Sequence, residues 1–96
     1  MKFEWDEDKN RQNIEKHAVT FEDACRIFDG FTLDVFDDRF DYGELREISI
    51  GMVGGAAILT VTHTDRDGTC RIISARQASR NEVKLYDQAL RQTFNS

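Results

Sequence analysis

The chain contains no proline, two cysteines and no long apolar run. Without proline or a low-complexity tract there is no candidate interdomain linker, so we expect one small domain over 1–96. Cys25 and Cys70 lack a Cys or His partner at metal-ligand spacing, which argues against a disulfide framework or zinc site and predicts two small core residues. No stretch has the length that crosses a bilayer, and residues 1–6 lack the apolar region of a secretory signal, so we expect a cytoplasmic protein that binds no membrane.

Basic residues are in the minority, since thirteen Lys/Arg face eighteen Asp/Glu for a net charge of −5. This balance argues against a protein that coats nucleic acid nonspecifically. The charge is divided, however, because residues 1–60 hold seven basic and fourteen acidic side chains, whereas residues 61–96 hold six and four. A basic face on an acidic body can bind an anion, and the acidic part can engage a basic protein; a solvated surface of mixed charge is the alternative.

The amino-terminal third predicts one strand and two helices. Lys2–Trp5 alternates polar and apolar residues as a short edge strand does, and Asp6 can cap a helix that ends near His17. Beyond Ile14 this helix has few apolar residues, so we expect it to lie partly exposed and to be held by its neighbours. Thr20 can cap a second helix. Its core stripe, at spacings of three and four, comprises Phe21, Ala24, Cys25 and Phe28.

The middle of the chain predicts an acidic segment followed by a β-hairpin. Segment 29–44 mixes aromatic residues with six carboxylates and has no clear period, so we expect a loop with one short strand, Leu33–Phe36. Two β-rich runs follow, Arg46–Val53 and Ala56–Thr64, and the two glycines between them are typical of a two-residue hairpin loop. Such a loop places Val53 opposite Ala56, and therefore Arg46 opposite His63.

A third run completes an antiparallel meander. Asp67-Gly68 supplies a second turn, and Thr69–Ala75 then returns as an interior strand, apolar on both faces at its centre. Strand alternation puts Arg71 on the same face as Ile73, from where it can reach a carboxylate of the acidic segment.

The carboxyl-terminal part predicts one helix. Ser79 and Glu82 have the spacing of a capping box, in which each side chain accepts from the backbone amide of the other. The expected buried stripe comprises Val83, Tyr86, Leu90 and Phe94. These elements predict an α+β fold in which an antiparallel sheet, made of the short N-terminal strand and the meander, packs with two N-terminal helices and one C-terminal helix.

Several patches match one family over nearly the whole chain. They read Trp5-Asp6-x-x-Lys9-x-x-x-Asn13-x-x-Lys16-His17-x-Val19-x-Phe21, Gly43-Glu44-x-Arg46, and Arg71-Ile72-Ile73-Ser74-Ala75-Arg76 followed by Glu82 and Tyr86. With these residues in this order the chain resembles BrnT-type toxins. The resemblance implies a RelE-like fold, a ribonuclease activity that arrests translation without a cofactor, and a BrnA-type antitoxin encoded beside the toxin. Where the family usually has glycine, this chain has Ala18, so we expect about 1 kcal/mol of backbone strain there or a different helix end.

An RNA-cutting mechanism without a metal ion needs few groups. The 2′-hydroxyl attacks the adjacent phosphorus, so the protein removes that proton, stabilises the charge on the phosphate and protonates the leaving oxygen. Relatives of the RelE type do this with Lys, Arg and Tyr. Arg66 and Arg76, at strand ends, are the predicted phosphate ligands, because a guanidinium matches phosphate oxygens. Either arginine can instead be a surface residue paired with Asp65 or Asp67.

The remaining candidates each have a structural alternative. His17 can act as acid or base, or can cap the helix end. His63 can act as a base kept neutral by Arg46, or can serve as neither acid nor base. Tyr86 can take part in catalysis or pack with its hydroxyl at the rim. Glu82 can cap the last helix or orient nearby arginines. The predicted RNA-binding residues are Lys9, Lys16, Arg46 and Arg80.

Two other functions compete with the enzyme. The chain can be a non-catalytic interaction module whose acidic face binds a basic partner. A DNA-binding regulator is disfavoured because no predicted helix carries a basic recognition face, so we expect DNA contact only through the antitoxin.

Overall fold

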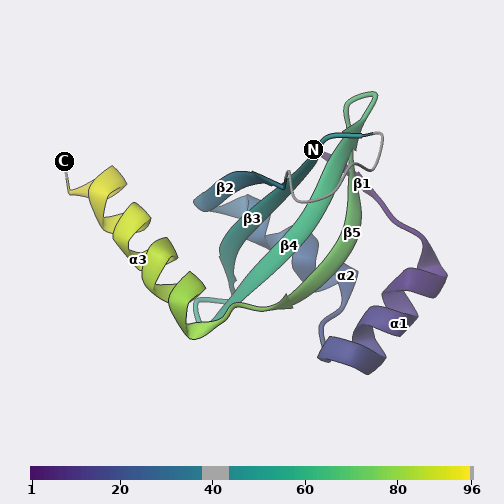
Figure 1. The fold of residues 1–96 in the computed structure, drawn as a ribbon, viewed down its shortest axis with the longest axis horizontal. Coiled ribbons are helices and arrows are strands. Elements are labelled where there is room, and N and C mark those ends of the chain that lie inside the picture. The colour runs from purple at the N-terminus through teal and green to yellow at the C-terminus, as the bar shows by residue number, and fades with distance from the viewer. Residues whose placement is uncertain (38–43, 96) are drawn as a thin grey trace.

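The computed structural model describes residues 1–37 and 44–95, and its centre is a five-stranded mixed sheet (Figure 1). The strand order is β1-β5-β4-β3-β2. In chain order the elements are β1 (Lys2–Glu4), α1 (Glu7–His17), α2 (Phe21–Arg26), the 3-10 turn η1 (Ile27–Asp29), β2 (Thr32–Asp37), β3 (Arg46–Val53), β4 (Ala57–Arg66), β5 (Thr69–Gln77) and α3 (Arg80–Phe94). The predicted α+β class is confirmed. In the chain, α1 and α2 precede the meander and α3 follows it.

The sheet differs from the predicted antiparallel one at both edges. β1 runs parallel to β5, because two helices and three strands separate them in the chain and provide the long connection that parallel pairing needs. At the other edge, the strand expected at Leu33–Phe36 is present as the longer β2, antiparallel to β3. Of the expected loop over 29–44, residues 38–43 lie outside the described residues.

The hairpin between β3 and β4 has a three-residue loop instead of the predicted two. Val53 pairs with Ala57, and the intervening Gly54 and Gly55 both have positive φ. His63 therefore faces Glu47, and the predicted pairing with Arg46 is wrong. A shift of one residue exchanges the faces of a strand, so Arg46 lies on the sheet face opposite to His63.

A β-bulge interrupts β5. Thr62 pairs with Ser74 while His63 pairs with Ile72, which leaves Ile73 without a partner on β4. Alternation along the strand therefore does not fix the face of Ile73, and the predicted grouping of Arg71 with Ile73 stays a prediction. The extra residue brings Arg71 onto the same face as Ser74, although three positions separate them.

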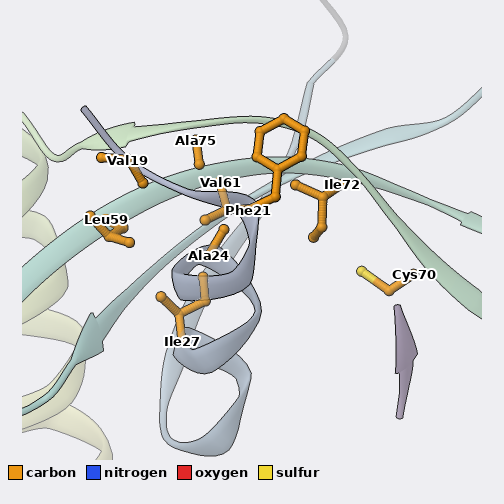
Figure 2. Packing of buried hydrophobic residues seen from close by; sticks show 9 residues of the cluster. All are labelled: Val19, Phe21, Ala24, Ile27, Leu59, Val61, Cys70, Ile72 and Ala75. Carbon is orange, nitrogen blue, oxygen red and sulfur yellow. The ribbon is translucent and has the colours of Figure 1, made fainter. Parts of the chain in front are cut away.

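The hydrophobic core lies on the sheet face covered by α2 and η1, which we call the helix face (Figure 2). Its buried residues are Val19, Phe21, Ala24, Ile27, Leu59, Val61, Cys70, Ile72 and Ala75. Gly51 permits this packing, since a Cβ there would lie 2.7 Å from Ile27 Cβ. Burial raises the pKa of both cysteine thiols to about 11, although Cys25 is only half-buried.

The first half of α3 packs against the opposite face. Tyr86 is buried and its ring lies against Phe31, whose centroid is 5.8 Å away. Figure 1 shows α3 projecting from the sheet, so the predicted buried stripe fails at its end, where Phe94 is 69% exposed.

Two buried asparagines hold α1, which has few apolar residues. Asn13 lies at the open edge of β5, where its side-chain amide donates to the carbonyl of Ala75 and accepts from the Ala75 amide. It also donates to the carbonyl of Val19. Asn10 accepts from the amide of Phe21. These bonds replace the apolar contacts that the helix lacks and fix its position beside β5.

The predicted helix ends are confirmed. Asp6 and Thr20 accept backbone amides at the starts of α1 and α2, and Ser79 forms a complete capping box with Glu82. Ala18 ends α1 with φ of 57°, the left-handed conformation in which an alanine is strained.

Candidate functional site

Four strand arginines lie on the sheet face opposite to the helix face. Strand register places Arg46 of β3, Arg66 of β4, and Arg71 and Arg76 of β5 there. We call this side of the sheet the arginine face. Each of the four has a carboxylate partner, so their positions are set by ion pairs.

The arginine face has two separate ends. Arg66 and Arg46 share Glu44, at 3.5 and 3.7 Å, near the turn between β4 and β5. Arg76 faces Thr60, and Arg66 lies six positions further along β4, roughly 20 Å of extended chain from Thr60. The two predicted phosphate ligands, Arg66 and Arg76, therefore do not lie together. Because β4 and β5 are antiparallel, their carboxyl-terminal ends lie at opposite ends of the strand pair. Two residues at the ends of adjacent strands can therefore lie far apart.

Arg71 lies between these ends but nearer to Arg66, because it pairs with Thr64 of β4. Its guanidinium is 3.4 Å from Glu4 of β1, beside which parallel pairing places it. In place of the expected contact with the acidic segment, Arg71 makes this cross-strand pair, because β1 is the neighbour of β5 at this position.

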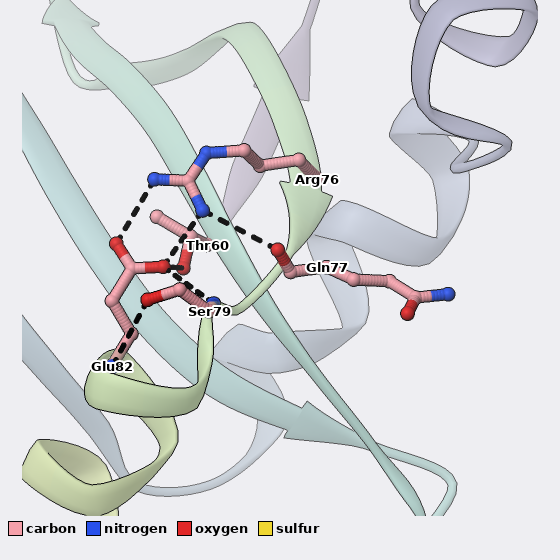
Figure 3. A network of polar contacts seen from close by, with 5 residues as sticks. All are labelled: Thr60, Arg76, Gln77, Ser79 and Glu82. Carbon is pink, nitrogen blue, oxygen red and sulfur yellow. Dashed lines mark hydrogen bonds and ion pairs between the residues drawn. The ribbon is translucent and has the colours of Figure 1, made fainter.

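Arg76 is held by a network at the start of α3 (Figure 3). Its two terminal nitrogens donate to the two carboxylate oxygens of Glu82, at 2.7 and 2.9 Å. Glu82 also accepts from the hydroxyl of Thr60 and from the amide of Ser79. Hydrogen bonds from Arg76, with smaller contributions from Ser79 and Thr60, lower the pKa of Glu82 to about 2. Both interpretations of Glu82 hold, since it caps α3 and orients Arg76.

Three predicted residues of α1 meet β5 beside this arginine. Lys9, Lys16 and His17 line a hollow of about 240 Å³ together with Ile73 and Ser74. Ser74 is two residues from Arg76 on the same side of β5, so the hollow adjoins the arginine face. We call Lys9, Lys16, His17, Arg71 and Arg76 the basic strip.

Two further candidates lie near α3. Arg80 is the first residue of that helix and is exposed. Tyr86 donates its hydroxyl to the carbonyl of Phe31 at 3.3 Å, and burial raises the pKa of the phenol. The structure thus gives Tyr86 a packing partner at both its ring and its hydroxyl.

His63 lies on the helix face, away from the basic strip. Its Nε2 is 2.7 Å from the hydroxyl of Ser49, which donates to Asp34 at 2.6 Å. Because that hydroxyl has one proton and gives it to Asp34, Nε2 must be the donor to Ser49. Burial lowers the pKa of His63, and Glu47 and Asp34 partly oppose the change. The predicted lowering of the His63 pKa is right, but it is caused by burial and not by Arg46.

Among residues 1–37 and 44–95, no group of three or more His, Cys, Asp or Glu side chains could hold a metal ion. No helix in the described part of the chain is both long and apolar enough to span a bilayer.

The fold and the basic strip define a small α+β protein with a cationic site suited to phosphate-bearing ligands. Residues 5–82 match the family model described as the ribonuclease toxin, BrnT, of a type II toxin-antitoxin system. The chain belongs to this family, and its partner is accordingly an antitoxin.

A solved structure agrees with this assignment. The 1.1 Å crystal structure of the Brucella abortus ribonuclease toxin BrnT is 29% identical, with a TM-score of 0.63, and the match covers 83% of this chain and 99% of that one. A search of curated proteins gives no significant match. The likeness to RelE stays a prediction.

Some contributors to the site had little signal in the sequence. Ser74 lies within a matched motif, but only the bulge shows that it shares a face with Arg71. Asn13 is also a motif residue, and its place at the edge of β5 required the fold. Glu4, at the end of β1, and Glu44, just before β3, pair with strand arginines and could have been sought as acids near the ends of strands.

Proposed function

We propose that this BrnT-family toxin cuts RNA on the basic strip without a metal ion, by attack of the 2′-hydroxyl on the adjacent phosphorus. The products are then a 2′,3′-cyclic phosphate and a 5′-hydroxyl. The observation that carries the proposal is the convergence of α1 cations on β5, where the bulge sets Arg71, Ser74 and Arg76 on one side. Fixed cations at that place stabilise the charge that develops on the phosphate.

Each role follows from position. Arg76 binds the scissile phosphate, supported by the Glu82 carboxylate that fixes the direction of its guanidinium. Lys9 and Lys16 attract the phosphate backbone into the hollow. His17, in the same hollow, takes the proton from the attacking 2′-hydroxyl and then gives it to the leaving 5′ oxygen.

The other predicted residues have lesser roles in this proposal. Arg80, exposed at the start of α3, contacts a flanking phosphate. Arg46 and Arg66 lie at the far end with Glu44 and stay outside the reaction. His63 and Tyr86 support the fold, since the first lies on the helix face and the second is bonded to Phe31.

We further propose a BrnA-type antitoxin as the partner, in the cytoplasm, with any DNA contact made by that partner. The net charge of −5 supports DNA contact through the partner, because an acidic protein is disfavoured as a direct DNA binder. A tightly bound antitoxin silences the toxin by mass action.

The test is RNA cleavage by purified antitoxin-free protein in EDTA. The wild type is expected to cut and to leave cyclic phosphate ends, while His17→Ala and Arg76→Lys lose about 100-fold or more in rate. Arg66→Ala is the matched control and keeps the wild-type rate.

Loss in Arg66→Ala with activity retained in the other two variants would move the site to the far end of the arginine face. Protein that binds antitoxin but never cuts RNA would favour the non-catalytic interaction module. Cleavage abolished by EDTA and restored by a divalent cation would contradict the metal-free mechanism.

A further inference from the structure

The helix face of the sheet is covered at its centre and open at one end. Core residues of α2 and η1 cover Leu59 and Val61. Beyond them, one cross-strand row runs from Phe36 of β2 through Glu47 to His63. Phe36 at the end of this row is 64% exposed, which is unusual for a large aromatic side chain on an outer strand.

A cavity of about 350 Å³ lies beside this row. Its apolar walls include Phe28 and Cys70, and its polar lining includes Asp34, Glu47 and Asp65. We call Asp34, Phe36, Glu47, His63 and Asp65 the acidic surface.

The charge of the acidic surface indicates that it binds a cationic group. Three carboxylates line the cavity, and none of its lining residues from 1–37 and 44–95 is a Lys or Arg. The α-amino group of Met1 is near, but it forms none of the ion pairs found among the described residues. A phosphate is repelled from such a place, whereas an ammonium or guanidinium group is attracted.

The hydrogen bonds that link His63, Ser49 and Asp34 in the cavity argue against Ser49 as a catalytic nucleophile. Ser49 is fully buried and gives its only proton to Asp34, so His63 cannot activate it as a nucleophile. These hydrogen bonds instead hold the Asp34 carboxylate in place, with Thr32 as a second hydroxyl donor at 2.9 Å. Apolar walls around fixed carboxylates suit the aliphatic stem and charged end of a Lys or Arg side chain.

We propose that the acidic surface is the docking site of the antitoxin, with an antitoxin Lys or Arg side chain in the cavity and a neighbouring apolar residue on Phe36. The proposal rests on the toxin-antitoxin pairing above and adds the surface and the chemistry that recognise the partner. Charge complementarity assigns the occupant, since the cavity is acidic and the adjoining aromatic ring is exposed. The surface lies on the sheet face opposite to Arg76, so this contact anchors the antitoxin, and silencing needs another segment of the antitoxin to cover the basic strip.

The first test compares two charge-matched double variants. Glu47→Gln with Asp65→Asn removes two negative charges from the acidic surface, and Glu15→Gln with Asp87→Asn removes two from exposed helix positions. The first is expected to weaken antitoxin binding by about tenfold or more in low salt, and the loss shrinks in about 0.5 M salt. The control stays within about twofold of the wild type. Phe36→Ser is expected to weaken binding at both salt concentrations.

Equal affinities for both double variants, or equal losses, would overturn the proposal. Thermal melts of each variant alone show that the fold is kept.

A second test does not depend on the antitoxin. N-acetylargininamide is titrated into the toxin while the imidazole resonances of His63 are followed, and N-acetylcitrullinamide serves as the neutral control. A saturable shift is expected with the arginine compound alone, and it disappears in Glu47→Gln with Asp65→Asn. Equal shifts with both compounds, or a shift that persists in that variant, would contradict a cation-binding cavity.

RNA cleavage distinguishes this proposal from the proposed function. The Glu47→Gln with Asp65→Asn variant is expected to cut RNA at the wild-type rate, because the acidic surface and Arg76 lie on opposite faces. If the wild type fails to cut RNA, the catalytic proposal fails while antitoxin affinity and the arginine titration still decide the docking site.

Discussion

At the scale of single residues, Ala18 is a strained backbone position that is simple to relieve. Its φ is 57°, and its amide closes α1 by donating to the carbonyl of Ile14. Glycine adopts this conformation without the Cβ clash, although it loses more chain entropy on folding. We expect Ala18→Gly to raise the free energy of unfolding by about 0.5–1 kcal/mol in urea denaturation.

The matched control is Ala78→Gly, at a position without positive φ, which should lower that free energy slightly. Destabilisation by Ala18→Gly would show that the strain is absent.

Glu82 gives a pH-dependent prediction. Its pKa is about 2 in the folded protein against an ordinary value of 4.5, so the unfolded chain takes up the proton first as pH falls. The stability from this carboxylate is complete above about pH 4.5 and is lost towards pH 2. Between pH 5.5 and 3 we expect the wild type to lose about 2 kcal/mol more than Glu82→Gln. If the free energies of unfolding of the wild type and of Glu82→Gln, measured by urea denaturation, fall in parallel with pH, this prediction is contradicted.

Residue-level signals in the sequence were accurate where the cause is local. Asp6 and the Ser79–Glu82 pair cap their helices as predicted, because a cap depends on residues within one turn. The partners found for Arg71 and His63 differ from the predicted ones, since each is set by pairing between strands distant in the sequence.

At the scale of elements, Asn13 attaches α1 to the sheet. Its amide satisfies both backbone groups of Ala75 and the carbonyl of Val19. Asn13→Ala leaves these buried groups without a partner, so we expect a loss of about 3 kcal/mol in the free energy of unfolding. RNA cleavage should fall as well, because α1 carries Lys9, Lys16 and His17 of the basic strip.

The neighbouring Gln12→Ala serves as control, as its side chain is exposed, and it should stay within about 0.5 kcal/mol of the wild type. Equal stability of the two variants would show that α1 is held by other contacts.

Element type was more predictable than element pairing. Turn residues and apolar periods revealed α1, α2, α3 and the meander, but a single extra loop residue moved the register of β3 on β4. The bulge at Ile73 had no signal either, because the run Ile72-Ile73 is equally compatible with a regular strand.

At the scale of the whole molecule, the two proposed functions, RNA cleavage and antitoxin docking, lie on opposite faces of the sheet. The basic strip gathers where α1 meets β5, and the acidic surface lies on the other face near β2. The sequence indicated the types of residue that the proposed site needs and their division between an acidic and a basic part. It could not show that Arg66 and Arg76 lie at opposite ends of one ladder, since that depends on the three-dimensional path of the strands.

The central claim is that RNA phosphate binds the basic strip. The most direct measurement is an NMR titration of the toxin with a short RNA whose attacking 2′-hydroxyl is replaced by hydrogen, so that it binds without being cut. The account predicts saturable amide shifts at Lys16, His17, Ser74 and Arg76, with little change at Arg66. Shifts confined to the Glu44 and Arg66 end, or to the cavity at His63, would contradict it.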